Sequence, residues 1–142
     1  DFKVLSEQKQ DGWFNEYDGP DLGYLSVTIE SLWEIYEVNK QKKILETIKI
    51  ALNYLNEILN LLDENIAIFN SRNTNYILPY SLFKSYYNSE TKNNLLIKNI
   101  ENIYGKNFNQ EHYFDSIDDR YLCHYLGQSI YKTLFLIQSY DK

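Results

Sequence analysis

Apolar residues recur at helical spacing along most of the chain. The clearest pattern covers residues 42–62, where a wide apolar stripe from Ile44 to Leu62 faces away from lysine, glutamate and asparagine side chains. Because this stripe is wider than a coiled-coil seam, it predicts a helix that packs on more than one neighbour. A similar pattern over residues 24–38 predicts a second helix. The short polar turn between the two predicts an antiparallel hairpin.

The rest of the chain alternates loops with further helical patterns. A long helix is predicted over 118–140, with Leu122, Tyr125, Leu126, Ile130, Leu134 and Ile137 facing inward. Weaker patterns predict helices within 82–87 and over about 91–104, the latter ended by Gly105. Residues 70–75 favour a loop because their side chains bond to local backbone. No strand pattern of useful length is present. The fold class is therefore all-α, built from antiparallel helical hairpins.

The segment 11–26 interrupts this helical pattern. It holds three of the five glycines and one of the two prolines. Carboxylates accept hydrogen bonds from hydroxyls, and aromatic faces cover apolar C–H surface, so their combination suits a polyhydroxylated ligand. The alternative is an irregular loop held by its aromatic residues, with Asp21 capping the next helix. The acidic and aromatic residues of the segment are Asp11, Trp13, Phe14, Glu16, Tyr17, Asp18, Asp21 and Tyr24.

Arginine is rare in a chain rich in lysine. Of the 14 basic residues, only Arg72 and Arg120 are arginines. Arginine presents a planar fork that binds a carboxylate or sulfate through two hydrogen bonds, so both residues are candidates for anchoring an anionic group of a ligand. The alternative is a structural ion pair with a loop acid, and for Arg120 this alternative is favoured.

Two pairs of residues are candidates for catalysis. His124 and Tyr125 lie together in the last predicted helix and form a potential base–acid pair, because histidine titrates near neutral pH. Glu16 with Asp18 or Asp21 forms a potential glycosidase pair. Asp11, Asn15, Asp18 and Asp21 form a potential calcium site, because they offer hard oxygen ligands. The alternative for each pair is an ordinary packed or solvated role. No phosphate-binding loop, nucleophile elbow or dinucleotide motif is present.

Composition excludes several classes of function. The net charge is −6 and the pI about 4.9, the opposite of a general nucleic-acid binder. The single cysteine, Cys123, and the two histidines fit no metal-ligand motif, so no cofactor is expected. No apolar run approaches the length of a membrane span. The absence of methionine suggests that the chain begins inside a longer gene product. Its compartment stays open, with the cytoplasm slightly favoured.

Three motifs resemble segments of a known family. The run 13–26, the segment Ser71-Arg72-Asn73-Thr74 followed by Pro79, and Asp118-Asp119-Arg120-Tyr121 with His124-Tyr125 resemble α/α-toroid proteins related to heparinase II/III-like polysaccharide lyases and their bacterial relatives. The resemblance implies helical hairpins whose loops line a cleft for an acidic or neutral glycan. It further implies that arginine or asparagine neutralises a uronate carboxylate, while histidine or tyrosine moves the proton.

Together these observations predict a single helical domain over 1–142, a fragment of a larger α/α-toroid protein. It binds or acts on a neutral or acidic polysaccharide; whether it is an enzyme stays open. The alternative is a non-catalytic structural or protein-interaction domain whose partner is the rest of its own chain or another protein. The loops should meet at one mouth of the helical array. The predicted substrate-binding residues are Trp13, Glu16, Tyr17, Asp18, Asp21, Tyr24, Arg72, Asn73 and Arg120, and the predicted catalytic residues are His124 and Tyr125.

Overall fold

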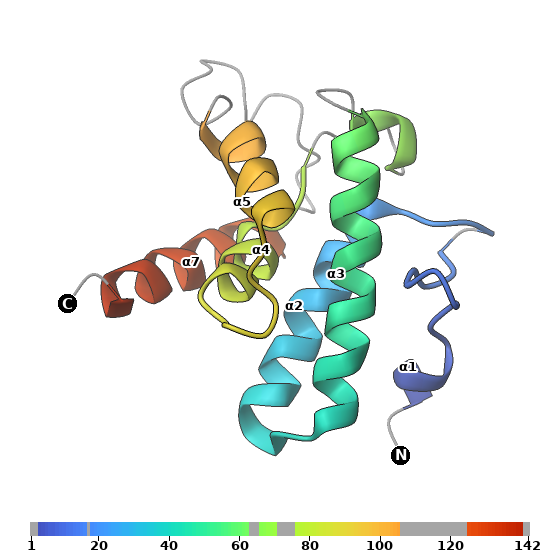
Figure 1. Cartoon of the computed structure of the whole chain (residues 1–142), viewed down its shortest axis with the longest axis horizontal. Helices are drawn as coiled ribbons and strands as arrows, with labels where there is room; N and C mark the ends of the chain where they lie inside the picture. Colours follow the sequence, from blue (N-terminus) through green and yellow to red (C-terminus); the bar gives the residue numbers. More distant parts are fainter. Residues whose placement is uncertain (1–2, 17, 63–65, 71–75, 106–124, 141–142) are drawn as a thin grey trace.

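The described part of the chain folds into helices (Figure 1). The computed structural model describes residues 3–16, 18–62, 66–70, 76–105 and 125–140. Apart from a single bridge between Glu16 and Gly19, these residues contain no β-structure, which confirms the all-α class. Within the same residues, no helix has both the length and the apolar character that crossing a membrane requires. The helical elements are α1 (Lys3–Ser6), α2 (Leu22–Asn39), α3 (Lys42–Leu62), η1 (Ile66–Phe69), α4 (Pro79–Tyr86), α5 (Asn94–Ile100), η3 (Glu101–Gly105) and α7 (Gly127–Tyr140).

Helices α2 and α3 form the predicted hairpin, side by side in Figure 1. Asp21 caps α2 because its side chain accepts a hydrogen bond from the Tyr24 backbone N–H at 2.9 Å. At the other end, Lys40 takes a left-handed conformation with φ 50°, which turns the chain into α3. Leu52 and Leu55 of the apolar stripe are buried. The stripe packs against both α2 and α5, which confirms that it serves more than one neighbour.

Helix α4 lies against α2 and begins earlier than the predicted start at residue 82. Pro79 occupies the first helical turn, where a missing N–H costs nothing and the fixed φ favours a helix, so the proline starts α4 at residue 79. Trp33 of α2 is fully buried, and its indole Nε1–H donates to Ser85 Oγ of α4 at 2.9 Å. This hydrogen bond satisfies the polar atom of a large core residue and fixes α4 on the hairpin.

Helix α5 covers α3 and continues into the π-helical turn η3, which ends at Gly105 as predicted. Helix α7 points away from the hairpin in Figure 1 and packs chiefly on α4. It also reaches α2 of the hairpin, because Lys132 bonds Glu30 and Glu34. The start of the predicted last helix, residues 118–124, lies outside the described residues.

The predicted inward face of the last helix is confirmed at Leu126, which is fully buried, and at Ile130, which packs beside it, but it differs elsewhere. Ser129, Thr133 and Leu136 are the buried residues of α7, whereas Leu134 is 54 % exposed and Tyr125 38 % exposed. Small hydroxyl side chains let α7 approach α4 closely, and the Ser129 hydroxyl accepts from the Tyr80 backbone N–H at 3.0 Å. This arrangement leaves some apolar side chains of α7, among them Leu134, turned away from the contact with α4.

The N-terminal segment lies against α3. Gln8 donates to the backbone oxygens of Gly12 and Thr47, at 3.1 Å and 2.9 Å. Gly12 has φ 110°, and a Cβ added there would lie 2.4 Å from the backbone oxygen of Ile50. Only glycine fits this position, because both the left-handed conformation and the close approach to α3 exclude a side chain.

Candidate ligand-binding site

The segment 11–26 is tied to the residues that flank the 71–75 loop. The Gly23 backbone N–H donates to Asn70 Oδ1 at 2.9 Å, and Asn70 Nδ2 donates to the Tyr76 backbone oxygen at 3.2 Å. The Leu78 backbone N–H donates to Ser26 Oγ at 3.0 Å. These bonds are buried, so they fix both flanks of the loop against the start of α2.

Leu126, which directly precedes α7, lies at the same junction. Tyr76, Leu78 and Leu126 form a small buried cluster, against which Tyr24 packs. The residues flanking three sequence-distant segments therefore meet near the start of α2. Of the predicted site residues, Tyr17, Arg72, Asn73, Arg120 and His124 lie outside the described residues, so their meeting stays a prediction.

The remaining predicted residues take different environments. Asp21 is buried as the cap of α2, and Asp18 is exposed with φ 66°. Glu16 is half-buried; burial, and secondarily the charge of Asp21, raises the pKa of its carboxyl above the usual value. Trp13 is half-buried, and Lys9 Nζ lies 5.9 Å from its ring centroid. Tyr24 is half-buried against the cluster described above.

A small polar pocket opens beside this junction, where α2 faces the start of α7. Its cavity volume is about 140 Å³. Among the predicted catalytic residues, Tyr125 lines this pocket. The lining is rich in groups that accept or donate hydrogen bonds and consists of Val27, Glu30, Ser31, Glu34, Leu78, Tyr125, Gln128 and Lys132.

Two carboxylates in this pocket share one lysine. Lys132 Nζ donates to Glu30 Oε1 at 3.0 Å and also bonds Glu34 Oε1. The Glu30 side chain is only 8 % exposed, against 24 % for Lys132 and 49 % for Glu34. Glu30 Oε2 is buried and has no hydrogen-bond partner within the described parts of the chain. The pair therefore leaves one acceptor unused inside the protein.

Burial is the largest single influence on the pKa of Glu30 and on the pKa of Lys132. It raises the pKa of Glu30 above its usual range, although hydrogen bonds from the Ser129 hydroxyl and Lys132 partly offset the effect. Burial lowers the pKa of Lys132, but the hydrogen bonds to Glu34 and Glu30 outweigh it, so this pKa is raised. Lys132 therefore stays charged near neutral pH, while burial disfavours the ionised form of Glu30.

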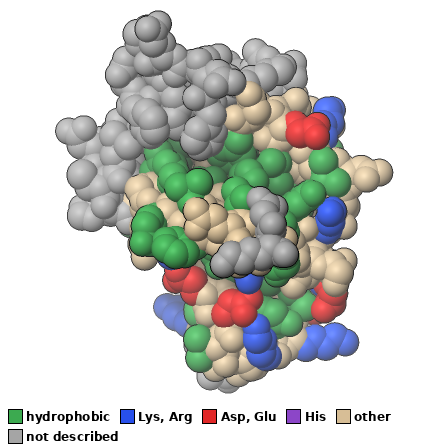
Figure 2. All heavy atoms as spheres, turned by 90° about the vertical axis from the view of Figure 1, so that its left-hand side faces the viewer, with side chains coloured by type: hydrophobic (Ala, Val, Ile, Leu, Met, Phe, Trp, Pro, Cys, Tyr) green, Lys and Arg blue, Asp and Glu red, His purple; other side chains and the backbone are tan. Residues whose placement is uncertain are grey.

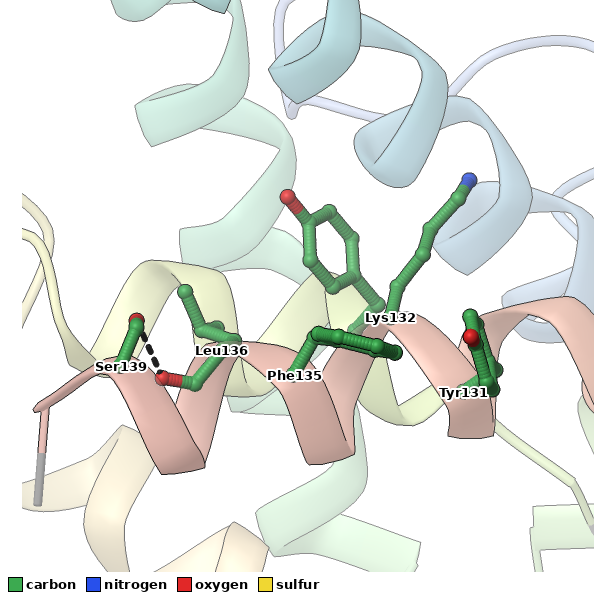
Figure 3. Close-up of a pocket in the computed structure, with 6 residues that line it drawn as sticks. Tyr131, Lys132, Phe135, Leu136 and Ser139 are labelled. Atoms are coloured by element: carbon green, nitrogen blue, oxygen red, sulfur yellow. Dashed lines mark hydrogen bonds between the residues drawn. The ribbon is translucent and has the colours of Figure 1, made fainter.

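A second pocket adjoins the first on the outer face of α7 (Figure 3). Its cavity volume is about 520 Å³. Tyr131 and Phe135 are 62 % and 56 % exposed, and their ring centroids lie 4.7 Å apart. Lys132 lines both pockets, and its ammonium lies 5.6 Å from the ring centroid of Tyr80. The lining comprises Tyr80, Tyr131, Lys132, Phe135, Leu136 and Ser139.

The two pockets share Lys132 in their linings, and we call them together the trough; one has aromatic rings, and the other has carboxylates, an amide and hydroxyls. Figure 2, which views the left-hand side of Figure 1, shows hydrophobic side chains gathered on this face with acidic and basic side chains below them. Carboxylates beside exposed aromatic faces are the combination that suits a polyhydroxylated ligand. The trough has this combination on α2, α4 and α7, and for the segment 11–26 it stays a prediction.

Sequence reasoning missed Glu30, Glu34, Lys132, Tyr131 and Phe135. One signal was available for Glu30, since it lies next to Ile29 on the inward face of an otherwise apolar helix pattern. A carboxylate in such a position is rare unless it is paired. Tyr131 and Phe135 were missed because we assigned the inward face of the last helix from its aliphatic residues, including Leu134 and Ile137.

Comparisons with protein-family models, with curated proteins and with solved structures gave no match. The fold and the trough therefore define the protein only as an all-α helical protein with a mixed aromatic and acidic surface trough. The relation to heparinase-like α/α-toroid proteins stays a prediction.

Proposed function

We propose that this helical protein binds carbohydrate in the trough between α2, α4 and α7. The observation that supports the proposal is the junction of the two pockets at Lys132. The aromatic end offers exposed ring faces, and the polar end offers hydrogen-bonding groups on a scaffold of packed helices. A sugar ring has both kinds of surface, because its C–H groups lie on the ring faces and its hydroxyls at the edge.

The binding mode follows from the exposure of each side chain. Tyr131 and Phe135 project from the outer face of α7 and cover the apolar face of a sugar ring (Figure 3). Glu34 is exposed enough to accept from a sugar hydroxyl while it keeps Lys132. Gln128 and Ser31 line the same pocket and add donors and acceptors. The trough thus binds one or two sugar units of a longer chain.

The predicted loop residues extend this proposal. Tyr125 lines the polar pocket, which places one predicted residue beside the proposed ligand. Trp13, Glu16 and Asp18 belong to the segment tied to the same junction and are proposed to bind further sugar units. The polysaccharide is neutral or acidic in this proposal, with proton transfer by His124 or Tyr125 as its catalytic extension.

Titration of the protein with neutral oligosaccharides of four to six units, followed by calorimetry, tests the proposal. We expect Phe135→Ala to weaken binding by about tenfold, since truncation of a central aromatic residue at an interface commonly costs 1–2 kcal/mol or more. Tyr140→Ala is the matched control, because Tyr140 is exposed and stacks on Tyr87 outside the trough. Equal losses from the two variants, or no binding of any oligosaccharide, would refute the proposal.

A second candidate function is a non-catalytic domain that contacts protein. An apolar groove of about 420 Å³ favours it; the groove lies between η3 and α7 and is lined by Phe83, Tyr104 and Leu134 among others. Leu134 is 54 % exposed there, although leucine gains by burial. If the oligosaccharides do not bind, while Leu134→Ser lowers the affinity of this domain for the remainder of its own chain, this second function is the better one.

A further inference from the structure

We infer that the polar end of the trough selects a sugar that carries an ammonium group, such as a glucosamine unit, over one that carries a carboxylate. The inference rests on the proposed carbohydrate-binding function and adds a ligand class to it. For the trough alone, it names a ligand class other than the neutral or acidic glycan that the family resemblance implies.

The charges that line the polar pocket do not balance. Glu30 and Glu34 contribute two carboxylates, and Lys132 contributes one ammonium that both carboxylates share. Further along α2, Glu37 pairs with Lys84 of α4 at 2.7 Å and with Lys40, so those lysines are committed elsewhere. The ligand-facing end of the trough therefore keeps an excess of negative charge.

Glu30 adds a buried negative charge behind Glu34. The residue is 6 % exposed, and its Oε2 atom has no hydrogen-bond partner among the described residues. A buried carboxylate oxygen without a partner is costly, and a nearby positive charge reduces that cost. Glu34 is the carboxylate that solvent reaches, so it bonds the ligand directly, while Glu30 behind it adds to the negative field.

Among the described residues that line the polar pocket, a ligand carboxylate has no comparable partner. Lys132 already donates to both glutamates, and the face of Tyr80 lies on a further side of its ammonium. A uronate would have to displace one of these contacts and would then meet two carboxylates at short range. An ammonium instead brings three donors to a site with surplus acceptors.

Four β-1,4-linked tetramers test the inference, made of glucosamine, glucose, N-acetylglucosamine and glucuronate. Their affinities are compared by calorimetry at low ionic strength and mildly acidic pH, where the glucosamine amine is charged. We expect the glucosamine tetramer to bind about fivefold more tightly than the glucose tetramer, as for a partly exposed ion pair, and the glucuronate tetramer to bind most weakly. Added salt should reduce this preference.

A pair of variants assigns the preference to the trough. Glu34→Gln should bring the ratio of the glucosamine and glucose affinities close to one, while Glu57→Gln, at an exposed position of α3, should leave the ratio unchanged. Circular dichroism confirms that both variants are folded. If the glucose or glucuronate tetramer binds as tightly as the glucosamine tetramer, the inference is wrong but carbohydrate binding stands. If no tetramer binds, both are overturned.

Discussion

Replacing Lys132 with methionine isolates the buried carboxylate of Glu30. Methionine keeps most of the apolar stem that Lys132 packs between the helices, so the change removes chiefly the charge and its hydrogen bonds. Glu34 loses a partner too, but it is half-exposed and its pair contributes little. The effect on the free energy of unfolding should therefore come from Glu30.

The structure sets both the size of this effect and its limit. Breaking a buried ion pair by removing one partner costs about 3–5 kcal/mol. Glu30 can escape that cost by taking up a proton. From its ordinary pKa of 4.5, protonation at pH 7 costs about 3.4 kcal/mol, at about 1.36 kcal/mol per unit of pH. We therefore expect Lys132→Met to destabilise the protein by about 2–3 kcal/mol at pH 7.

The same limit predicts a pH dependence with a definite sign. A carboxyl whose folded pKa is raised binds more protons in the folded state, so stability falls as pH rises from 4.5 toward the folded pKa. At pH 5 the cost of protonation is only about 0.7 kcal/mol, so the variant should be nearly as stable as the parent. Urea unfolding at pH 5 and pH 7, followed by circular dichroism, measures both values.

The double variant Glu30→Gln with Lys132→Met is the control. It removes both charges and keeps the shape, so its stability relative to the parent should change little between pH 5 and pH 7. A loss in Lys132→Met below about 0.5 kcal/mol at pH 7, or the same loss at both pH values, contradicts the assignment of Glu30 as a buried partner of Lys132.

Three further predictions concern the hairpin and its neighbours. Leu52→Ala should cost about 2–5 kcal/mol in urea unfolding, because the side chain is 1 % exposed in the core; a loss below about 0.5 kcal/mol contradicts its central position. Gly12→Ala should lower the melting temperature by several degrees, whereas Gly19→Ala, where an added Cβ has no neighbour within 4 Å, should leave it unchanged; equal effects would refute the packing argument. Trp33→Phe should cost about 1–3 kcal/mol because it leaves Ser85 without its indole donor, and Ser85→Ala in the same background should add little to that loss.

Much of the fold follows from the sequence because its signals are local. The stripe over 42–62 defines α3 with its observed bounds, and the Asp21 cap and the turn before residue 42 define α2 and the hairpin. We predicted the start of α4 at residue 82, whereas Pro79 begins it. The orientation of α7 was missed because hydroxyl side chains form its contact, and hydrophobic periodicity does not register them.

The candidate site was far less predictable. Glu30, Lys132 and Tyr131 acquire their roles only when α2 and α7 meet, and no spacing along the sequence shows that meeting. We predicted a ligand site in the segment 11–26 from its composition. In the structure, however, Asp21 is the buried cap of α2, and Gly12 is a residue that packs against α3. Composition identifies which residue types are present, whereas the packing of helices decides which of them share a surface.

The contact that holds α7 has a thermodynamic consequence. Of its buried residues Ser129, Thr133 and Leu136, only one is apolar. Ile130 and Ile137 are only half-buried, so detaching α7 exposes less apolar area per residue than opening the hairpin does, with a smaller heat-capacity change and a weaker dependence on denaturant. Its enthalpy comes from hydroxyl hydrogen bonds and from Lys132. Warming should accordingly release α7 well before the hairpin melts, whereas dilute urea, which acts through exposed surface, should leave it in place.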